Sequence, residues 1–355
     1  MGSREEEIKL ADKVQKELLK RHDDVPIIYD AQKLLDKKRQ VVSVSPSLDI
    51  ALGGGILEGT WSILSGPPKA GKTVTALQIA ANAQKLGKFV YFFAIESRVK
   101  PRDLKGINGF DIDMCKIVQS EPGCILTAED FLNDAMLAIK THPGCVIILD
   151  SASALCSSGE FSKDITATGR ADGPKLLASF CRQMGGVVPA QNTIVIIIQH
   201  LIANTSGYGP TYVEDGGRKI TYQFDTKIRC KGVQKWLEGE KKQIGNILTW
   251  EIVGSPLGPP GGTTESYLRF GRGIDSEMEL VVVGADLGLI SKAGSWYTLD
   301  FILDNPQLLK SLFPPQENNE YAKLLKFQGQ EKVKDFIKEN PQVKEYLFNR
   351  IKELS

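Results

Sequence analysis

Residues 66–73 read Gly66-Pro67-Pro68-Lys69-Ala70-Gly71-Lys72-Thr73. This segment fits G-x-x-x-x-G-K-[ST], the pattern of a loop whose backbone N–H groups surround a phosphate at a helix N-terminus. An apolar run at 61–65 precedes it and a helical pattern at 74–81 follows it. That is the strand–loop–helix context that the motif requires. The sequence therefore predicts a nucleoside triphosphate site, and a glycine-rich turn that matches by chance is the alternative.

The side chains of the loop suit a triphosphate accompanied by Mg²⁺. Lys72 would reach the β- and γ-phosphates, and the hydroxyl of Thr73 would bind the metal. The predicted nucleotide-binding residues are Gly66, Pro67, Pro68, Lys69, Ala70, Gly71, Lys72, Thr73, Val74 and Asp150. Thr73 and Asp150 are the predicted metal ligands.

The bulk composition excludes several classes of protein. The chain has 355 residues, a net charge of +1, 42% hydrophobic and 25% charged residues, which is typical of a globular protein larger than one small domain. The net charge argues against a protein that is basic throughout, but it does not exclude a local basic groove. The chain has six cysteines without a C-x-x-C pair and three histidines that are not spaced with them. This pattern disfavours a zinc site and favours buried thiols. Without a secretory signal or an apolar run of membrane length, we expect a soluble cytoplasmic protein with no membrane partner.

Apolar runs alternate with helical patterns after the loop. The strand candidates are 88–96, 114–120, 144–150 and 192–200, and the helical patterns are 73–86, 128–141 and 175–184. Strands this apolar, separated by helices, are typical of a parallel sheet covered on both faces. The sequence thus predicts an α/β fold whose ligand lies at the carboxyl ends of the strands.

Three of these strand candidates end in a polar residue. Asp150 closes 145–149 in the manner of an aspartate that holds Mg²⁺ behind a phosphate loop. Glu96 closes 89–95, where a carboxylate can orient the attacking water; an exposed strand end is the alternative. His200 ends the run 194–199 and suggests a sensor of the γ-phosphate, although a lone histidine can equally be structural.

Two long polar segments follow strand ends. Residues 157–170 contain Lys163 and Arg170, and residues 203–219 end in Gly216-Gly217-Arg218-Lys219. Long loops in compact domains are usually functional or disordered. The candidate groups for contact with nucleic acid are Lys163, Arg170, Tyr208, Tyr212, Gly216, Gly217, Arg218 and Lys219. A solvated surface loop is the competing interpretation.

The two ends of the chain carry separate patterns. Residues 5–22 form an amphipathic helix that would pack either on its own core or on a neighbouring subunit. Strand candidates at 225–232, 245–254 and 265–270 suggest an antiparallel region, and helical patterns at 321–327, 331–338 and 343–353 follow. The predicted domains are an N-terminal helix and linker at 1–40, an ATPase core at 41–285, and a small C-terminal α/β domain at 286–355.

Several segments together resemble the RecA recombinases, and in particular the phage homologues of the UvsX type. The resemblance runs from about residue 42 to residue 297. Glu96 matches the glutamate that activates water in that family, and Asp150 its metal-binding aspartate. The other matching segments are 45–53 before the loop, 151–155 leading into the first DNA-binding loop, Gly216-Gly217 closing the second, 271–275, and 292–297. The last two are the most specific, because a generic ATPase with a phosphate loop does not need them.

The resemblance implies a RecA-type ATPase core with a mostly parallel sheet and two DNA-binding loops. It implies a DNA-dependent ATPase that uses ATP and Mg²⁺, forms a helical filament on single-stranded DNA, and promotes pairing and strand exchange with double-stranded DNA. Glu96, Lys72 and His200 would be its catalytic residues. The N-terminal helix would dock on the next subunit of a homo-oligomer. Mediator and single-strand-binding proteins are further candidate partners, in a bacterial or phage-infected cytoplasm.

The chain also departs from the family pattern. Gln199-His200 replaces Asn-Gln, which is similar to the UvsX form and favours His200 as the γ-phosphate sensor. Asp103 stands where the family stacks a tyrosine on adenine. Gly254 and Pro256 stand where bacterial lysines sense ATP across the filament interface, so Arg218, Lys219 or Arg229 would have to replace them. The rival functions are a ring helicase with the same core and an ATP-switched recombination mediator that acts through protein contacts.

Overall fold

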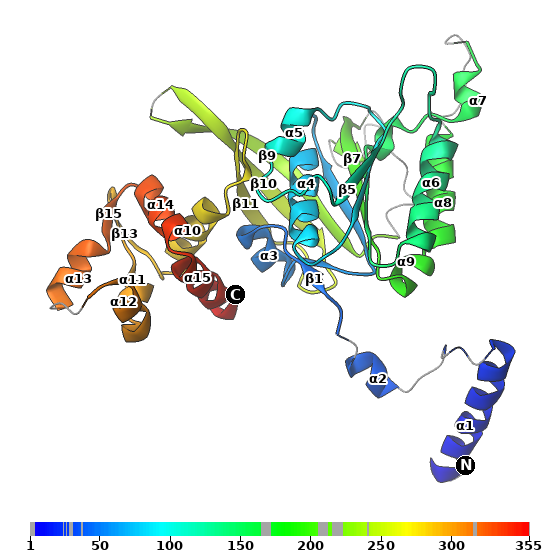
Figure 1. Cartoon of the computed structure of the whole chain (residues 1–355), viewed down its shortest axis with the longest axis horizontal. Helices are drawn as coiled ribbons and strands as arrows, with labels where there is room; N and C mark the ends of the chain where they lie inside the picture. Colours follow the sequence, from blue (N-terminus) through cyan, green and yellow to red (C-terminus); the bar gives the residue numbers. More distant parts are fainter. Residues whose placement is uncertain are drawn as a thin grey trace. The chain divides into compact units, whose positions relative to one another are not determined.

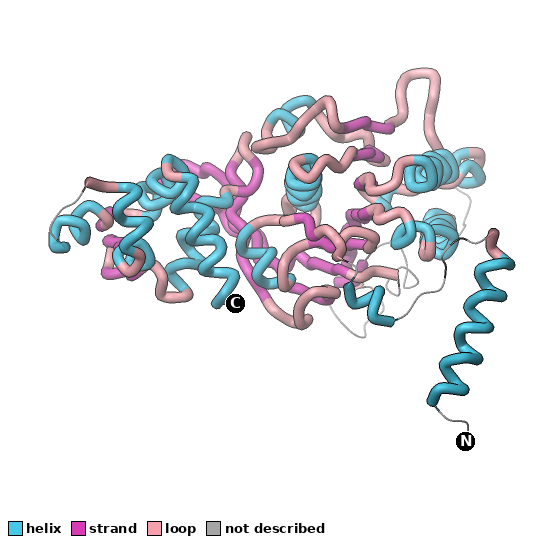
Figure 2. The backbone as a smooth tube through the Cα atoms, turned by 60° about the horizontal axis from the view of Figure 1, so that its bottom comes forward, coloured by secondary structure: helices cyan, strands magenta, loops and turns pink. Residues whose placement is uncertain are grey.

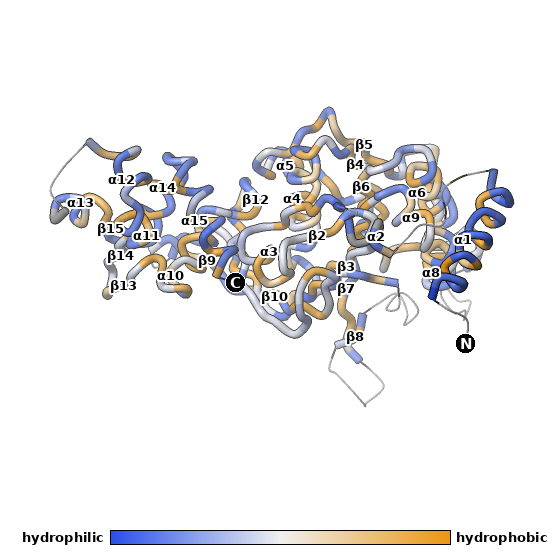
Figure 3. Tube along the Cα trace, turned by 90° about the horizontal axis from the view of Figure 1, so that it is seen from below, coloured by the Kyte–Doolittle hydropathy of each residue, from blue (hydrophilic) through white to orange (hydrophobic). Residues whose placement is uncertain are grey.

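The computed structural model describes residues 4–354 except 24, 26, 28–30, 37, 165–171, 205–211, 215–222, 240 and 315–317. The chain divides into two units, Met1–Gln40 and Val41–Ser355. The first unit contains α1 (Arg4–Arg21), which confirms the predicted N-terminal helix, and α2 (Ala31–Asp36). No residue of α1 is buried. Figure 3 shows α1 as mostly hydrophilic with apolar residues interspersed along it.

A ten-stranded sheet forms the centre of the second unit in the described part of the chain. Its order is β12-β11-β10-β9-β3-β7-β6-β4-β5, with β8 paired to β7. Neighbours from β9 to β5 are parallel, and those from β9 to β12 are antiparallel. The strands are β3 (Trp61–Gly66), β4 (Val90–Ala94), β5 (Cys115–Val118), β6 (Val146–Asp150), β7 (Ile194–Ala203), β8 (Tyr212–Glu214), β9 (Thr226–Glu238), β10 (Lys242–Gly254), β11 (Thr263–Arg269) and β12 (Gly273–Ile274). The predicted α/β class with a mostly parallel central sheet is confirmed.

Alternation along the strands builds a hydrophobic core on each face of the sheet. In β7, Ile194, Ile196 and Ile198 belong to the core that contains α4, whereas Val195 and Ile197 belong to the other core. The first core is covered by α3 (Pro46–Leu52) and α4 (Lys72–Gln84); the second is covered by α6 (Ala128–Thr141), α8 (Gly173–Met184) and α9 (Val187–Ala190). Helices therefore lie on both sides of the strands (Figures 1 and 2), as continuous apolar strands require.

The antiparallel hairpin of β9 and β10 is longer than the sequence predicts. Strands were expected at 225–232 and 245–254, but β9 continues to Glu238 and β10 begins at Lys242. The prediction stopped too early because Gly232 and the polar residues after it interrupt the apolar pattern. The extension is held by its backbone hydrogen bonds and by Trp236. The Trp236 ring packs edge-on against Tyr267 with 5.3 Å between ring centroids, and its centroid lies 4.5 Å from Cζ of Arg269.

The C-terminal segment has its own core. It contains α10 (Ser276–Asp286), β13 (Ser291–Ala293), β14 (Trp296–Thr298), α11 (Asp300–Leu303), α12 (Pro306–Leu312), α13 (Asn318–Leu324), β15 (Lys326–Gln328), α14 (Gln330–Glu339) and α15 (Pro341–Leu354). Leu280 and Val281 of α10 share this core with Tyr297 and Leu347. The helix predicted over 321–327 is wrong at its end, because Lys326–Gln328 pairs with β14. In the described part of the chain, no helix is long and apolar enough to cross a membrane.

Two buried carboxyl groups hold the segment before the phosphate loop: Asp49 from within the segment and Glu279 from α10. Asp49 in α3 accepts hydrogen bonds from the Ser43 hydroxyl at 2.5 Å and the Val44 N–H at 2.7 Å. Glu279 in α10 accepts one from the Ser47 N–H at 3.0 Å. Burial raises the pKa of each carboxyl to about 7, against the opposing effect of these hydrogen bonds. The segment preceding the loop is thereby fixed to the C-terminal core.

These raised pKa values make stability depend on pH. Asp49 ionises with a pKa near 3.8 in an unfolded chain and about 7 in the fold, so folding is favoured at acid pH and loses free energy as pH rises from about 4 to about 7. Asp49→Asn cannot ionise and keeps an acceptor for Val44. Between pH 5 and pH 8, the wild type should lose at least ~1 kcal/mol of unfolding free energy relative to this variant. Urea unfolding at both pH values checks this, with Asp113→Asn at an exposed position as the control. Equal pH slopes in wild type and Asp49→Asn would contradict it.

Candidate functional site

The phosphate loop joins β3 to α4 at the carboxyl edge of the sheet. Gly71 has a φ of 74°, and a Cβ atom on it would come within 2.8 Å of Leu248 and 2.9 Å of Leu268. A Cβ atom on Gly66 would lie 2.8 Å from that of Cys230. Both glycines are thus required by close packing against β9, β10 and β11. Sequence reasoning predicted these glycines from phosphate binding alone and did not predict this packing.

Lys72 lies inside the loop at the first turn of α4. Its Nζ atom donates to the carbonyl oxygens of Gly66 at 2.9 Å and Pro67 at 2.8 Å, and the residue is 5% exposed. Burial lowers the pKa of this ammonium group, while the charges of Asp150 and Glu96 oppose the shift. An ammonium held by two neutral carbonyls in a low-dielectric site is suited to exchange one of them for an anionic phosphate oxygen.

Thr73 and Asp150 meet as the motif predicts. The Thr73 hydroxyl donates to Oδ2 of Asp150 at 2.8 Å, although 77 positions separate the two residues. Burial raises the pKa of Asp150, and the bond from Thr73 offsets only part of that shift. Among the described residues, no group of three or more His, Cys, Asp or Glu side chains is placed to hold a metal ion by itself. A magnesium ion bound on a phosphate needs only one or two protein oxygens, which this pair fits.

Glu96 follows β4 and makes three side-chain contacts. Its Oε1 atom accepts from the Ser151 hydroxyl at 2.5 Å and from Nε2 of His200 at 2.7 Å. Its Oε2 atom lies 3.1 Å from Nη1 of Arg98. Burial raises the pKa of Glu96, but the bonds from Ser151 and His200 and the charge of Arg98 outweigh it and leave the pKa below its ordinary value. The carboxylate therefore stays ionised.

His200 lies beside the phosphate loop, within β7. The parallel register places His200 opposite Gly66, and its N–H donates to the Ser153 hydroxyl at 3.0 Å. Its Nδ1 atom is buried without a hydrogen-bond partner among the described residues. The prediction that the strand ends at His200 is wrong, because β7 continues to Ala203 by pairing with β8, Ala203 opposite Tyr212. His200 thus links Glu96 to a strand that leads away from the phosphate loop.

A second group of charges, which sequence reasoning missed, fastens β8 to β9. Glu214 at the end of β8 lies 2.7 Å from Nζ of Lys227 and 2.9 Å from Nη2 of Arg229. Lys227 is 2% exposed. These cations outweigh the effect of burial and leave the pKa of Glu214 below its ordinary value. Arg229 also pairs with Glu251 at 3.3 Å, so this candidate for an interface sensor is already bound within its own chain. The sequence signal that could have revealed this group is the alternation of Lys227, Arg229 and Lys231, which places three cations on one face of a strand.

The predicted DNA-contacting residues are only partly described. Lys163 is exposed just after α7 (Ser158–Phe161), and Tyr212 is 60% exposed in β8. Arg170, Tyr208, Gly216, Gly217, Arg218 and Lys219 lie outside the described residues. β8 stands between the two undescribed segments 205–211 and 215–222, so Tyr212 and Glu214 mark where both segments join the sheet.

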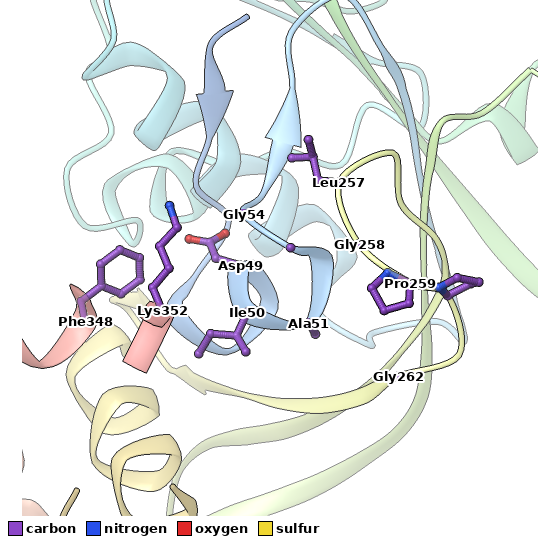
Figure 4. Close-up of a pocket in the computed structure, with 12 residues that line it drawn as sticks. Asp49, Ile50, Ala51, Gly54, Leu257, Gly258, Pro259, Gly262, Phe348 and Lys352 are labelled. Carbon is purple, nitrogen blue, oxygen red and sulfur yellow. The ribbon is translucent and has the colours of Figure 1, made fainter. Parts of the chain in front are cut away.

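A cavity of about 480 Å³ lies away from this site. Figure 4 shows it between α3, the turn 257–262 and the end of α15, where Asp49 and Lys352 line it. This turn follows β10, whose last residue pairs with Lys227 near the start of β3. The cavity is therefore at the amino edge of the parallel strands, opposite the edge that holds the phosphate loop.

Comparisons with known proteins agree on one family. A sequence profile of the RecA N-terminal domain matches residues 12–275. Protein RecA of Nitratiruptor sp. is 28% identical over 323 residues, covering 90% of this chain and 86% of that protein. Protein RecA of Bifidobacterium longum is 27% identical over 328 residues, covering 91% and 75%. Protein RecA of Acholeplasma laidlawii is 29% identical over 287 residues, covering 77% and 85%.

The buried ion pair between Glu214 and Lys227 predicts a large effect on stability. Glu214→Ala leaves the Lys227 ammonium buried without its carboxylate, which should cost about 3–5 kcal/mol of unfolding free energy. The double variant Glu214→Leu/Lys227→Met removes both charges and should recover most of that loss. Urea unfolding measures both. Glu238→Ala, which breaks an exposed pair with Lys242, should cost under ~1 kcal/mol. The interpretation fails if Glu214→Ala is no less stable than Glu238→Ala.

Proposed function

The chain belongs to the RecA family, and from this premise we infer that it is a DNA-dependent ATPase that acts as a RecA-type recombinase. One observation supports this function most. Nε2 of His200 bonds Oε1 of Glu96 at 2.7 Å, and His200 lies on β7, which runs from beside the phosphate loop toward the segment 205–211. The contact would connect the carboxylate proposed to act at the γ-phosphate with the strand that leads to the proposed DNA-binding region. A nucleotide-dependent DNA-binding protein needs such a connection.

The phosphate loop supplies the binding of ATP. Gly66–Thr73 would surround the phosphates with N–H groups, and Lys72 would exchange its bonds to Gly66 and Pro67 for phosphate oxygens. Thr73 and Asp150 would hold Mg²⁺, which when bound offsets the negative charge of the phosphate oxygens. Val74, in the first turn of α4, completes the proposed nucleotide site.

Glu96 supplies the orientation of water. Its ionised carboxylate accepts from Ser151 and His200 on one oxygen, which fixes the plane of the group. The other oxygen would accept a proton of the attacking water as that water's oxygen bonds to the γ-phosphorus. The bond to the β-phosphate oxygen breaks with its electron pair on ADP, and inorganic phosphate is released. His200 would respond to the same phosphate through its bond to Glu96.

The DNA-binding role rests on the segments beside β8. We assign contact with single-stranded DNA to Lys163, Arg170, Tyr208, Tyr212, Gly216, Gly217, Arg218 and Lys219. Tyr212 is exposed enough to stack on a base. α1, which buries none of its residues, would dock on the next copy in a helical filament that exchanges strands with double-stranded DNA.

Finer aspects belong to the same proposal. The kinship with phage UvsX-type proteins rests on His200 alone. A cytoplasm, bacterial or phage-infected, is the expected location, and mediator and single-strand-binding proteins are expected partners. The proposed division is an N-terminal region at 1–40, a core at 41–285 and a C-terminal domain at 286–355. α10, which lies almost entirely before residue 286, shares a hydrophobic core with the residues after 286, and this supports a close attachment of the last two.

Electron microscopy distinguishes this function from its rivals. With single-stranded DNA and a non-hydrolysable ATP analogue, we expect helical filaments. Closed rings would favour the helicase alternative, and no assembly would favour the mediator. Strand exchange between a circular single strand and a linear duplex, with ATP and without it, is the matching activity assay. The proposal fails if neither filaments nor ATP-dependent exchange are found.

The bond between His200 and Glu96 predicts that a change at His200 affects ATP-dependent DNA binding but not ATP binding itself. His200→Ala should bind ATP within about threefold of the wild type, because Lys72 and the loop remain. It should lose the strengthening of DNA affinity that ATP causes, because the link to β7 and β8 is cut. Fluorescence anisotropy of a labelled oligonucleotide, with and without the ATP analogue, measures the ratio. His142→Ala, at the end of α6, is the control. A ratio in His200→Ala equal to that of the wild type would refute the role.

A further inference from the structure

Arg98 is an exposed cation held against the catalytic carboxylate. Its Nη1 atom lies 3.1 Å from Oε2 of Glu96, and its side chain is 83% exposed while that of Glu96 is 15% exposed. The other oxygen of Glu96 already accepts from Ser151 and His200. Arg98 therefore contacts the carboxylate oxygen that does not bond Ser151 or His200, which is the oxygen proposed to face the attacking water.

The backbone between the two residues is shaped for this contact. Ser97 has a φ of 50°, a conformation that non-glycine residues adopt at a cost. Its N–H donates to the Ala94 carbonyl at 2.8 Å, and its hydroxyl donates to the same oxygen at 3.3 Å. This tight turn at the end of β4 carries the chain back, so that Arg98 reaches the side chain two residues before it. Strain of this kind is commonly found at functional positions.

Three other cations near the loop, among the described residues, are bound to other groups. Lys72 is buried in the phosphate loop and donates to two carbonyls. Lys227 and Arg229 are paired with Glu214. Arg98 differs because its guanidinium is largely solvated, and ion pairs of exposed side chains contribute little free energy. A triphosphate arriving beside Glu96 would compete well for its guanidinium, which can bind two phosphate oxygens at once.

We propose that Arg98 is a catalytic residue of ATP hydrolysis, held on Oε2 of Glu96 without nucleotide and transferred to the γ-phosphate oxygens when ATP binds. This inference rests on the proposed function of Glu96. The transfer has two effects. It frees Oε2 to accept the proton of the attacking water, and it places a positive charge on the phosphoryl oxygens as the bond to ADP breaks. Hydrolysis in the absence of a correctly placed γ-phosphate is thereby suppressed.

The test compares Arg98→Ala and Arg98→Lys with a matched control. Arg102→Ala removes another exposed arginine, 81% exposed and 3.7 Å from Asp103. In DNA-stimulated ATP hydrolysis, Arg98→Ala should lose kcat on the order of 100-fold with KM within about threefold of the wild type. Arg98→Lys should recover part of that loss, and Arg102→Ala should match the wild type.

A binding measurement shows whether Arg98 touches the phosphoryl group. ADP with aluminium fluoride mimics the transferring phosphate, so its affinity should fall in Arg98→Ala while the affinity for ADP alone is unchanged. A kcat in Arg98→Ala within about threefold of the wild type, or a lowered kcat with normal affinity for ADP–aluminium fluoride, would overturn the proposal. The variant Glu96→Gln distinguishes a failure of this inference from a failure of the proposed function of Glu96. If Glu96→Gln hydrolyses ATP at the wild-type rate, the proposed function of Glu96 falls and this inference with it; if only Arg98→Ala is normal, this inference alone falls.

Discussion

Burial of the central strands on both faces decides where the chemistry can lie. Val146 to Leu149 of β6 are fully buried, so a charge on either face would need a partner inside the core. The first position that can present a carboxylate to a ligand is the strand end, Asp150. Because β4 and β7 flank β6 in parallel register, Glu96 and His200 reach the same edge. The site is a consequence of this packing, and its residues need no proximity in sequence.

Two neighbouring carboxyl groups at this edge have opposite environments. The N–H of Glu96 donates to the backbone carbonyl of Asp150 at 3.2 Å. Burial dominates at Asp150 and raises its pKa, whereas the groups around Glu96 outweigh burial and lower its pKa. A buried carboxyl whose ionised form a cation would stabilise is suited to bind a metal ion. A carboxylate that is already ionised is suited to orient a water molecule. Environments that push two pKa values apart are a recurring sign of different roles in one site.

Local patterns carried most of the sequence prediction, and long-range pairing caused its errors. The helix predicted over 128–141 coincides with α6, whose apolar stripe and capping residue Thr127 are local signals. The meeting of Thr73 and Asp150 followed from the motif and the parallel sheet. By contrast, the continuation of β7 to Ala203 depends on a partner strand beyond the segment 205–211. The contact of Glu214 with Lys227 and the strand β15 likewise depend on residues that meet only in the folded chain.

The way β8 is held limits how a nucleotide at the phosphate loop could influence the proposed DNA-binding region. At one end, Glu214 is bound to Lys227 and Arg229 of β9. At the other end, among the described residues, Tyr212 is held by its pairing with Ala203, three residues beyond His200. Because Lys227 is buried and its release from Glu214 would leave an unpaired charge, the Glu214 end is the fixed one. We therefore expect a shift of β7 at His200 to move β8 chiefly at Tyr212, which follows the segment 205–211.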